Sequence, residues 1–193
     1  MKGTEKMKVV AFNGSPRKEG NTHLLINHVF QELEKEGIET EEFSFVGKKI
    51  HGCLACYKCF QNKDKHCSVK EDALNECLDK MMAADGIILA SPVYFADVTA
   101  EMKALIDRAG FVSMANGQLF RNKVGGSIAA LRRTGGVQTI DSLNHFFLAM
   151  QMVLTGRGIA IGRDIGDVEK DEEGIGFMKL LGQRMAWLLK KLQ

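Results

Sequence analysis

The sequence predicts an α/β fold of the doubly wound type, a three-layer sandwich in which helices cover both faces of a five-stranded parallel sheet. Two observations favour it. Short apolar runs, typical of buried strands, recur along the chain. Between them lie segments whose apolar residues recur at helical spacing. A regular alternation of strand and helix predicts a parallel sheet, because each crossover between parallel strands is made by a helix.

The first half of the chain contributes two strands and two helices. Residues 7–12, MKVVAF, are an apolar run that predicts a buried strand. Residues 21–37 carry apolar side chains at helical spacing and finish at a glycine, a common helix stop. Residues 38–45 alternate between polar and apolar, which indicates a one-sided strand near a sheet edge. Residues 71–85 again show an amphipathic helical pattern.

The second half continues the alternation. Residues 86–95 contain a fully apolar strand that ends at a Ser-Pro pair, and residues 99–110 follow as a helix. Residues 123–131 predict the fourth strand, and residues 137–152 the helix after it.

A short fifth strand within 155–162 and an amphipathic helix at 176–192 close the chain. Five strands in this alternation fit the flavodoxin-like order 2-1-3-4-5. Sheets of this kind bind ligands beyond the carboxyl ends of their strands, so the loops after strands one, three and four are the candidate binding segments. No repeat, low-complexity tract or linker interrupts the pattern. We therefore expect one domain over residues 7–193, preceded by a disordered leader at 1–6.

Composition limits the partners and the compartment. The 193 residues are 45% hydrophobic and 26% charged, and the net charge of +2 is spread along the chain. That pattern gives no basic stripe for nucleic acid. No apolar run is long enough to span a membrane, and the charged start does not resemble a signal peptide. We expect a cytoplasmic protein, in which clustered cysteines favour metal or redox chemistry over disulfides.

The loop after the first strand, FNGSPRKEGNTHLL, has the composition of an anion site. Gly14 permits a tight turn, Ser15, Asn21 and Thr22 offer donors, and Arg17 adds a fork-shaped guanidinium suited to phosphate. The start of a helix attracts anions through its free N–H groups and its dipole. Neither a Walker A nor a G-x-G-x-x-G pattern occurs, which favours the terminal phosphate of a mononucleotide. The alternative is that Asn21 or Thr22 only caps the helix.

A cysteine-rich loop at residues 51–68 holds four of the five cysteines in the pattern C-x2-C-x2-C-x7-C. These are Cys53, Cys56, Cys59 and Cys67. Three thiolates two residues apart can converge on one compact cluster, and the pattern resembles the bacterial C-x2-C-x2-C-x3-C-P run. Zinc more often uses two separated C-x2-C pairs. A 4Fe-4S cluster, a zinc ion and free or redox-active thiols all remain open. Cys77, on an amphipathic helix, is expected in the core.

These motifs occur together and in order: NGSPRKEGNT, four close cysteines, ASPVYFADVTAEMKALIDR and RRTGG. Over nearly the whole chain from Met7 the sequence resembles the flavodoxin-like NAD(P)H-dependent FMN reductase family, with the iron–sulfur flavoproteins as the nearest branch. The resemblance implies an oxidoreductase that passes electrons from NAD(P)H or reduced ferredoxin through FMN to a small-molecule acceptor. It also implies a homodimer or homotetramer whose neighbouring subunit completes the flavin site. Residues 107–123 are a candidate contributor, with Phe111, Met114, Leu119 and Phe120 available to a partner.

The resemblance also implies the site residues. The FMN phosphate is expected at the loop after the first strand, and the isoalloxazine ring against SPVYF and LRRTGG. Gly135 and Gly136 would let the backbone approach the flavin edge, because they carry no Cβ. The implied cofactor-binding residues are Ser15, Arg17, Asn21, Thr22, Pro92, Val93, Tyr94, Phe95, Arg132, Arg133, Thr134, Gly135 and Gly136. The implied ligands of a 4Fe-4S cluster are Cys53, Cys56, Cys59 and Cys67.

No residue is predicted to be catalytic, because a bound flavin itself carries hydride and electron transfer. Lys103, Asp107 and Arg108 are expected to serve structural contacts, salt bridges or an oligomer interface. Two other functions stay open: a flavodoxin-like electron carrier without turnover, and a binding module whose cysteines sense redox state or metal.

Overall fold

The computed structural model describes residues 6–192 and contains a five-stranded parallel sheet in the order β2-β1-β3-β4-β5. The predicted order 2-1-3-4-5 is confirmed. The strands are β1 (Lys8–Asn13), β2 (Glu39–Ser44), β3 (Gly86–Pro92), β4 (Val124–Leu131) and β5 (Val153–Ile161). Residues 1–5 of the expected leader lie outside the described residues.

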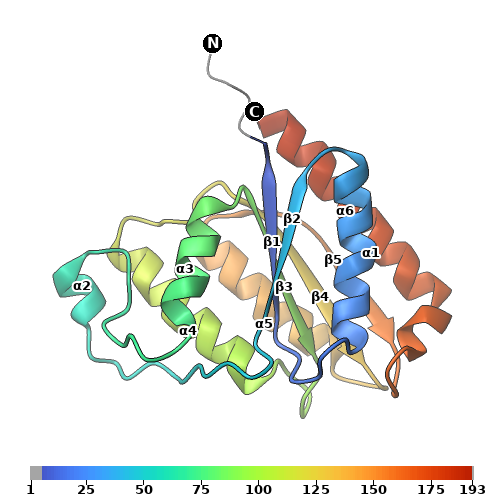
Figure 1. Cartoon of the computed structure of the whole chain (residues 1–193), viewed down its shortest axis with the longest axis horizontal. Coiled ribbons are helices and arrows are strands. Elements are labelled where there is room, and N and C mark those ends of the chain that lie inside the picture. The colour runs from blue at the N-terminus through green and yellow to red at the C-terminus, as the bar shows by residue number, and fades with distance from the viewer. Residues whose placement is uncertain (1–5, 193) are drawn as a thin grey trace.

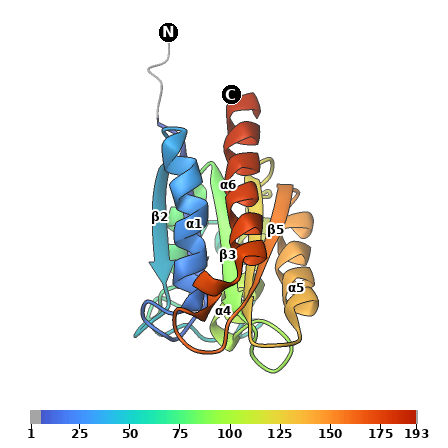
Figure 2. The ribbon, with the colours of Figure 1, turned by 90° about the vertical axis from the view of Figure 1, so that its right-hand side faces the viewer.

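Helices cover both faces of the sheet, as the three-layer prediction requires. Helices α1 and α6 lie on one face, and α3, α4 and α5 lie on the other (Figure 1, Figure 2). The helices are α1 (Asn21–Lys35), α2 (Lys58–Asn62), α3 (Leu74–Ala83), α4 (Ala100–Ala115), α5 (Gly136–Ala149) and α6 (Glu172–Leu192), with a 3₁₀ turn η1 (Asp167–Lys170). No helix among the described residues is both long and apolar enough to cross a membrane.

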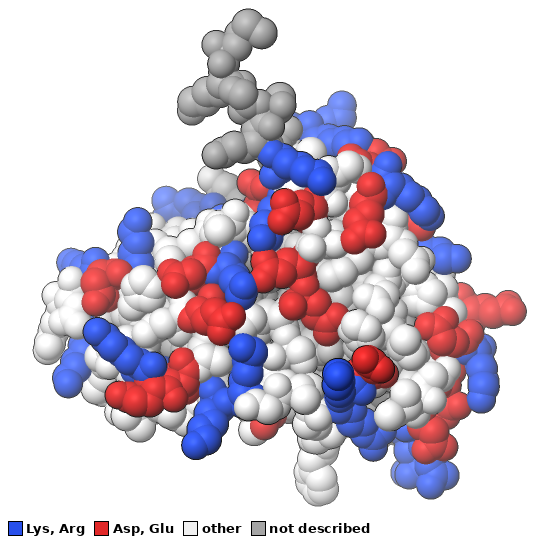
Figure 3. Space-filling model, in the orientation of Figure 1, with Lys and Arg blue, Asp and Glu red and all other residues white. Residues whose placement is uncertain are grey.

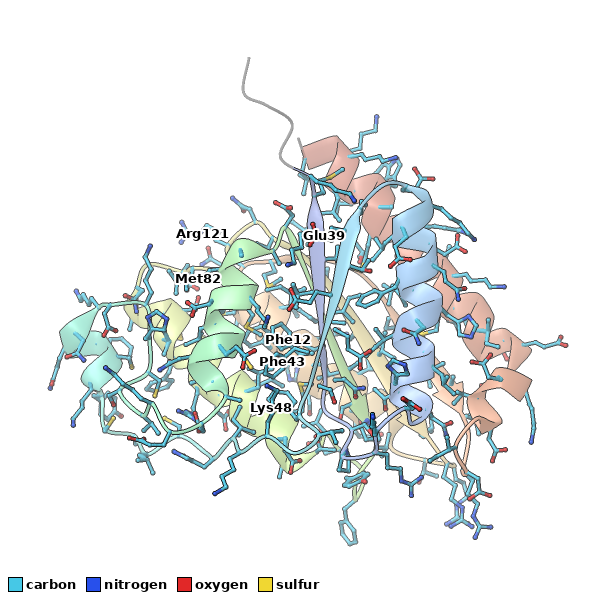
Figure 4. The ribbon with its side chains drawn as sticks, viewed as in Figure 1. Phe12, Glu39, Phe43, Lys48, Met82 and Arg121 are labelled. Carbon is cyan, nitrogen blue, oxygen red and sulfur yellow. The ribbon has the colours of Figure 1, made fainter. Side chains whose placement is uncertain are left out.

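Each face of the sheet buries its own hydrophobic cluster, and β1 contributes to both. Val10 and Phe12 belong to the cluster under α3, α4 and α5, whereas Val9 and Ala11 belong to the cluster under α1 and α6. This is why the inner strands read as continuous apolar runs. The edge strand β2 instead alternates, and its Phe43 lies beside Phe12, with ring centroids 5.8 Å apart (Figure 4).

Helices α1 and α6 approach each other closely at one glycine. A Cβ at Gly182 would come within 2.7 Å of the Val29 carbonyl oxygen on α1. A larger residue would force the helices apart. Because α6 lies against α1, the chain between β5 and α6 passes next to the start of α1, where the anion loop lies.

Several elements begin or end a few residues from their predicted bounds, and two of the differences, at α4 and α2, have a clear physical reason. Helix α4 continues to Ala115, beyond the expected residue 110, because the buried Val112 and Ser113 keep its inner face against the core. Helix α2, inside the cysteine loop, has no buried residue, so it lacks the amphipathic pattern that would have predicted it. Phe120, expected to be available to a partner, is instead fully buried in the chain's own core.

Candidate flavin and cysteine sites

A cleft of about 420 Å³ opens at the carboxyl edge of the sheet. Four loops form it, those after β1, β3, β4 and β5, and three of them were predicted. The lining residues are Ser15, Arg17, Asn21, Thr22, Pro92, Val93, Tyr94, Ala130, Leu131, Arg132, Gly162, Arg163 and Asp164. We call this the flavin cleft below.

The turn that leaves β1 is held between two other elements. The Gly14 N–H donates to the Ala90 carbonyl of β3 at 2.8 Å, and the Thr99 hydroxyl donates to the Gly14 carbonyl at 2.9 Å. A Cβ at Gly14 would lie 2.9 Å from Thr99 Oγ1 and 3.1 Å from the Met102 Cβ. Only glycine fits this close approach without a shift of α4.

A polar network behind the turn fixes Ser15. Asn13, at 1% exposure, accepts the Ser15 N–H at 2.9 Å through Oδ1 and donates from Nδ2 to Glu42 at 2.8 Å. The other Glu42 oxygen lies 2.6 Å from His23 Nδ1 on α1. Ser15 Oγ in turn accepts the Arg17 N–H at 3.2 Å. The turn is therefore preorganised, because buried polar groups that are fully bonded rigidify their surroundings.

Asn13, Glu42 and His23 were missed by the sequence analysis. The His23 side chain is 30% exposed. The available signal was the position of Asn13, a polar residue directly at the end of an apolar strand.

The start of α1 is left open toward the flavin cleft. Its N-cap is Gly20, no side chain caps it within the described part of the chain, and no acid lies in its first turn. Asn21, expected at the phosphate, binds the loop after β5 with its side chain. Nδ2 donates to the Asp164 carbonyl at 2.9 Å, and Oδ1 accepts the Gly166 N–H at 2.8 Å. The alternative of a merely capped helix does not describe this helix start, whose N–H groups remain free for an anion.

Three guanidiniums border the flavin cleft: those of Arg17, Arg132 and Arg163. None forms a salt bridge with another residue among those described. Asp164 is the one acid among the lining residues. Unpaired guanidiniums beside a helix N-terminus create a positive potential suited to phosphate.

The exit of β3 shapes the opposite wall. The Val93 N–H donates to the Ala130 carbonyl at 2.8 Å, and Tyr94 forms a tight turn with Asp97. Phe95 at the tip of this turn has a positive φ of 48° and is fully exposed, away from the lining residues.

The RRTGG segment meets this wall from β4, but only its first arginine lines the flavin cleft. Arg133, Thr134, Gly135 and Gly136, which were implied at the flavin, are not among the lining residues. Gly135 has a φ of +87°, and a Cβ there would lie 2.7 Å from Val93 Cγ1. Its role in this chain is to let the two loops approach each other.

The cysteine loop forms a second site, in the lobe that carries α2 at the left of Figure 1. All four expected cysteines line one small hollow of about 20 Å³, which shares no lining residue with the flavin cleft. Ala55 and Tyr57 between them have φ values of +50° and +56°, so the backbone turns sharply at each. In the described part of the chain, no three Cys, His, Asp or Glu side chains converge as ligands of one metal ion would.

Donor groups surround these sulfurs. The Ala55 N–H donates to Cys53 Sγ at 3.4 Å. The Lys58 N–H and the Ser68 hydroxyl lower the pKa of the Cys56 thiol, whereas burial raises the pKa of Cys59. Arg108 Nη2 donates to Cys67 Sγ at 3.3 Å. Cys77 lies apart in the core, as expected, and burial raises the pKa of its thiol.

Comparisons with known proteins identify the family in which this combination of a cleft and a cysteine loop occurs. The family model described as NADPH-dependent FMN reductase matches residues 7–165. The chain belongs to this family. An iron–sulfur flavoprotein of Methanocaldococcus jannaschii is 38% identical over 197 residues, which cover 97% of this chain and 100% of the relative. The chain therefore falls in the iron–sulfur flavoprotein branch of the FMN reductases.

Solved structures confirm the flavodoxin-like fold. RosB, solved with bound 8-demethyl-8-formylriboflavin-5'-phosphate, superposes with a TM-score of 0.81 at 18% identity, covering 97% of this chain and 80% of RosB. A flavodoxin from the domain Archaea gives a TM-score of 0.61 at 16% identity, covering 95% and 99%. At such identities the likeness concerns the fold alone.

FMN fits the flavin cleft of this member of the FMN reductase family. An uncapped helix start, a preorganised serine and three unpaired guanidiniums suit a dianionic phosphate. Membership of the family makes the chain an FMN-binding protein of the flavin oxidoreductase class.

The cysteine loop has the donor chemistry of an iron–sulfur site. Its four thiols, the N–H donor to Cys53 and the guanidinium at Cys67 are features that hold and tune a thiolate-ligated cluster.

Proposed function

We propose that this chain is an FMN-dependent oxidoreductase that takes electrons from NAD(P)H or reduced ferredoxin and delivers them to a small acceptor. The observation that carries the proposal is the flavin cleft, where an uncapped α1 start faces three unpaired guanidiniums. Bound FMN supplies hydride transfer and single-electron transfer at such a site. The protein contributes position, charge and shelter from water.

Separate walls of the flavin cleft would hold the parts of FMN. Ser15, Thr22 and Arg17 surround the helix start and would bind the phosphate. Val93 and Tyr94 supply backbone groups and apolar surface for the ring. Arg132 from the β4 loop would stabilise negative charge on the ring when it is reduced, since a nearby cation favours the charged form.

We further propose that Cys53, Cys56, Cys59 and Cys67 hold a 4Fe-4S cluster, which would store single electrons beside a two-electron flavin. The charge of the surrounding lobe favours an acidic electron donor. Between residues 48 and 70, six lysines accompany one aspartate, and all seven are exposed. Figure 3 shows basic side chains over this lobe, interspersed with acidic ones. Ferredoxins are small acidic carriers, and complementary charge speeds the association of such partners.

We also propose a homodimer or homotetramer of a cytoplasmic protein. Leu54, Tyr57, Phe60 and Met114 expose 67%, 57%, 39% and 52% of their surface around the cysteine loop. Such a group of large apolar side chains is suited to burial against another copy. Light scattering on the purified protein measures the assembly, and a strictly monomeric mass would contradict it.

The function is tested on protein purified without oxygen. Iron, acid-labile sulfide and flavin are counted first, and reduction by NADH, NADPH and reduced ferredoxin is then followed in the visible spectrum. We expect about four irons and one FMN per chain, with multiple turnovers when an acceptor is present. Reduction by ferredoxin without NAD(P)H turnover would identify an electron carrier. Zinc alone, without flavin, would identify a sensing module and contradict the proposal.

A salt series distinguishes the two donors. If the lysine-rich lobe receives an acidic carrier, the rate with ferredoxin falls steeply as ionic strength rises. Lys63→Gln combined with Lys65→Gln should lower the ferredoxin rate and leave the NAD(P)H rate unchanged. Lys179→Gln combined with Lys191→Gln, two exposed lysines on α6, is the control with the same loss of charge. Equal ferredoxin rates in all three proteins would show that the lobe does not receive the carrier.

A further inference from the structure

Arg108 on α4 is the largest fully buried side chain of the described chain. Its side chain is 1% exposed, although arginine is among the residues least often buried. The sequence analysis expected it to serve packing, a salt bridge or an oligomer interface. Its surroundings in the structure indicate a more specific one.

The guanidinium is held on three sides. One nitrogen, Nη1, is bound to Asp72 and also donates to the His51 carbonyl at 3.1 Å. The other, Nη2, donates to Cys67 Sγ at 3.3 Å. Asp72 is itself only 2% exposed and accepts the Leu74 N–H at 3.2 Å. The carboxylate therefore fixes the direction in which the guanidinium points, and it points at a sulfur.

Stability alone does not explain this arrangement. A buried ion pair loses its hydration, and apolar side chains of similar volume commonly stabilise a protein at least as well. The neighbouring residues Val112 and Phe111 show that apolar side chains are available on the same helix. What an apolar residue could not supply is a fixed positive charge and a donor at Cys67.

We propose that Arg108, anchored by Asp72, is a positioning residue that orients Cys67 toward the other three thiols and raises the reduction potential of the cluster they hold. The inference rests on the proposed cluster. Reduction adds a negative charge to a thiolate-ligated cluster, and a fixed cation beside one ligand stabilises the reduced form. Removing the cation therefore lowers the potential. The flavin cleft shares no lining residue with this site, so the FMN affinity is unaffected.

The test is an anaerobic, dye-mediated redox titration of the FMN-loaded protein, with the cluster followed by electron paramagnetic resonance. We expect Arg108→Met to make reduction of the cluster at least about tenfold less favourable, a shift of about 59 mV for one electron. Arg108→Lys keeps the charge but loses the fork, so its potential should stay close to the wild-type value while iron is lost faster to a chelator. Lys103→Met is the control, because it removes a charge from the exposed face of the same helix. It should change the equilibrium constant for reduction of the cluster by less than about twofold.

A second variant serves as the control for misfolding. Arg108→Met leaves Asp72 charged and buried, whereas the double variant Asp72→Asn, Arg108→Met leaves no unpaired charge. The double variant should fold, bind FMN with wild-type affinity and still have a lowered cluster potential. If Arg108→Met does not fold, the cluster potential of the double variant tests the proposal.

The outcomes separate this inference from the proposed function. Wild-type protein without iron and sulfide would overturn both. A second outcome would overturn the role of Arg108 alone. In it the wild-type protein holds a cluster, and the equilibrium constant for reducing that cluster changes by less than about twofold in Arg108→Met or in the double variant.

Discussion

The flavin cleft and the cysteine loop are built in opposite ways. The flavin cleft is formed by loops at the ends of strands, stiffened by buried side chains such as Asn13 at 1% exposure. The cysteine loop contributes exposed or half-buried side chains, and its helix α2 buries no residue. Arg108 of α4 ties the loop to the domain through the His51 carbonyl and Cys67 Sγ. The first site is preorganised by the fold, whereas the second depends on a few side chains and on what they bind. Substitutions in the two regions should therefore fail in different ways.

The largest difference is expected when one cysteine is replaced. Cys67→Ser should reduce iron content by more than about tenfold. Replacing even a residue that only orients a metal ligand lowers the affinity for the metal 10- to 100-fold. FMN content should stay at the wild-type level, since the flavin cleft contains no cysteine. Iron, sulfide and flavin analysis of one sample measures both.

The buried Cys77 provides the matched control. Cys77→Ala should keep its iron and cost about 1 kcal/mol in the free energy of unfolding, through the small cavity it leaves. Equal iron in Cys67→Ser and wild type would mean that this cysteine does not bind the cluster.

Arg17→Ala tests the flavin cleft by a smaller effect. Hydrogen bonds to charged groups contribute about 1.5–3 kcal/mol, so the Kd for FMN should rise roughly 10- to 150-fold. Riboflavin, which lacks the phosphate, should bind both proteins equally. Quenching of flavin fluorescence measures each Kd. Lys18→Ala, at the exposed neighbouring position, should change neither Kd by more than about twofold. A loss of riboflavin affinity equal to that of FMN would show that Arg17 does not act on the phosphate.

Gly14→Ala tests whether the flavin cleft depends on backbone fit. The added Cβ would lie 2.9 Å from Thr99 Oγ1 and 3.3 Å from the Ala90 carbonyl oxygen. Overpacking of this kind costs about 1–3 kcal/mol, measured by chemical denaturation, and FMN should also bind more weakly. Gly176 is a helical glycine with open space around it. We expect Gly176→Ala to raise the free energy of unfolding by about 0.5–1 kcal/mol. Unchanged stability in Gly14→Ala would mean that the turn is free to move.

The smallest effect concerns acid stability outside both sites. Hydrogen bonds from Lys8 and Lys80 hold the pKa of Glu41 below its ordinary value of 4.5. A carboxyl group with a lowered folded-state pKa contributes stability above its unfolded pKa and loses it as the pH falls through the folded value. The free energy of unfolding should therefore decline less steeply below pH 4.5 in Glu41→Gln than in wild type. Parallel curves for the two proteins would contradict the assignment. Because Glu41 is partly exposed, the difference should be small.

Much of the fold was predictable because strands and helices carry their own periodicity. The strand order followed from five alternating elements, and β2 was correctly placed at an edge because its side chains alternate. Helix α2 was missed because it buries nothing, and periodicity reports burial.

The candidate sites were predictable where a motif is local in sequence. Ser15, Arg17 and Tyr94 were expected from single segments, and they line the flavin cleft. The loop after β5 was missed because its contact with Asn21 joins residues more than 140 positions apart. Asp72, the partner of Arg108, was missed for the same reason: a long-range contact between α4 and the bend before α3 leaves no local pattern.

The most direct test of the central claim is a titration of the flavin-free protein with FMN and with riboflavin. The account predicts one FMN per chain, a raised melting temperature, and an affinity for FMN at least about tenfold above that for riboflavin, because the phosphate adds charge-assisted hydrogen bonds. Equal affinities for the two flavins, or a melting temperature that excess FMN does not change, would contradict it.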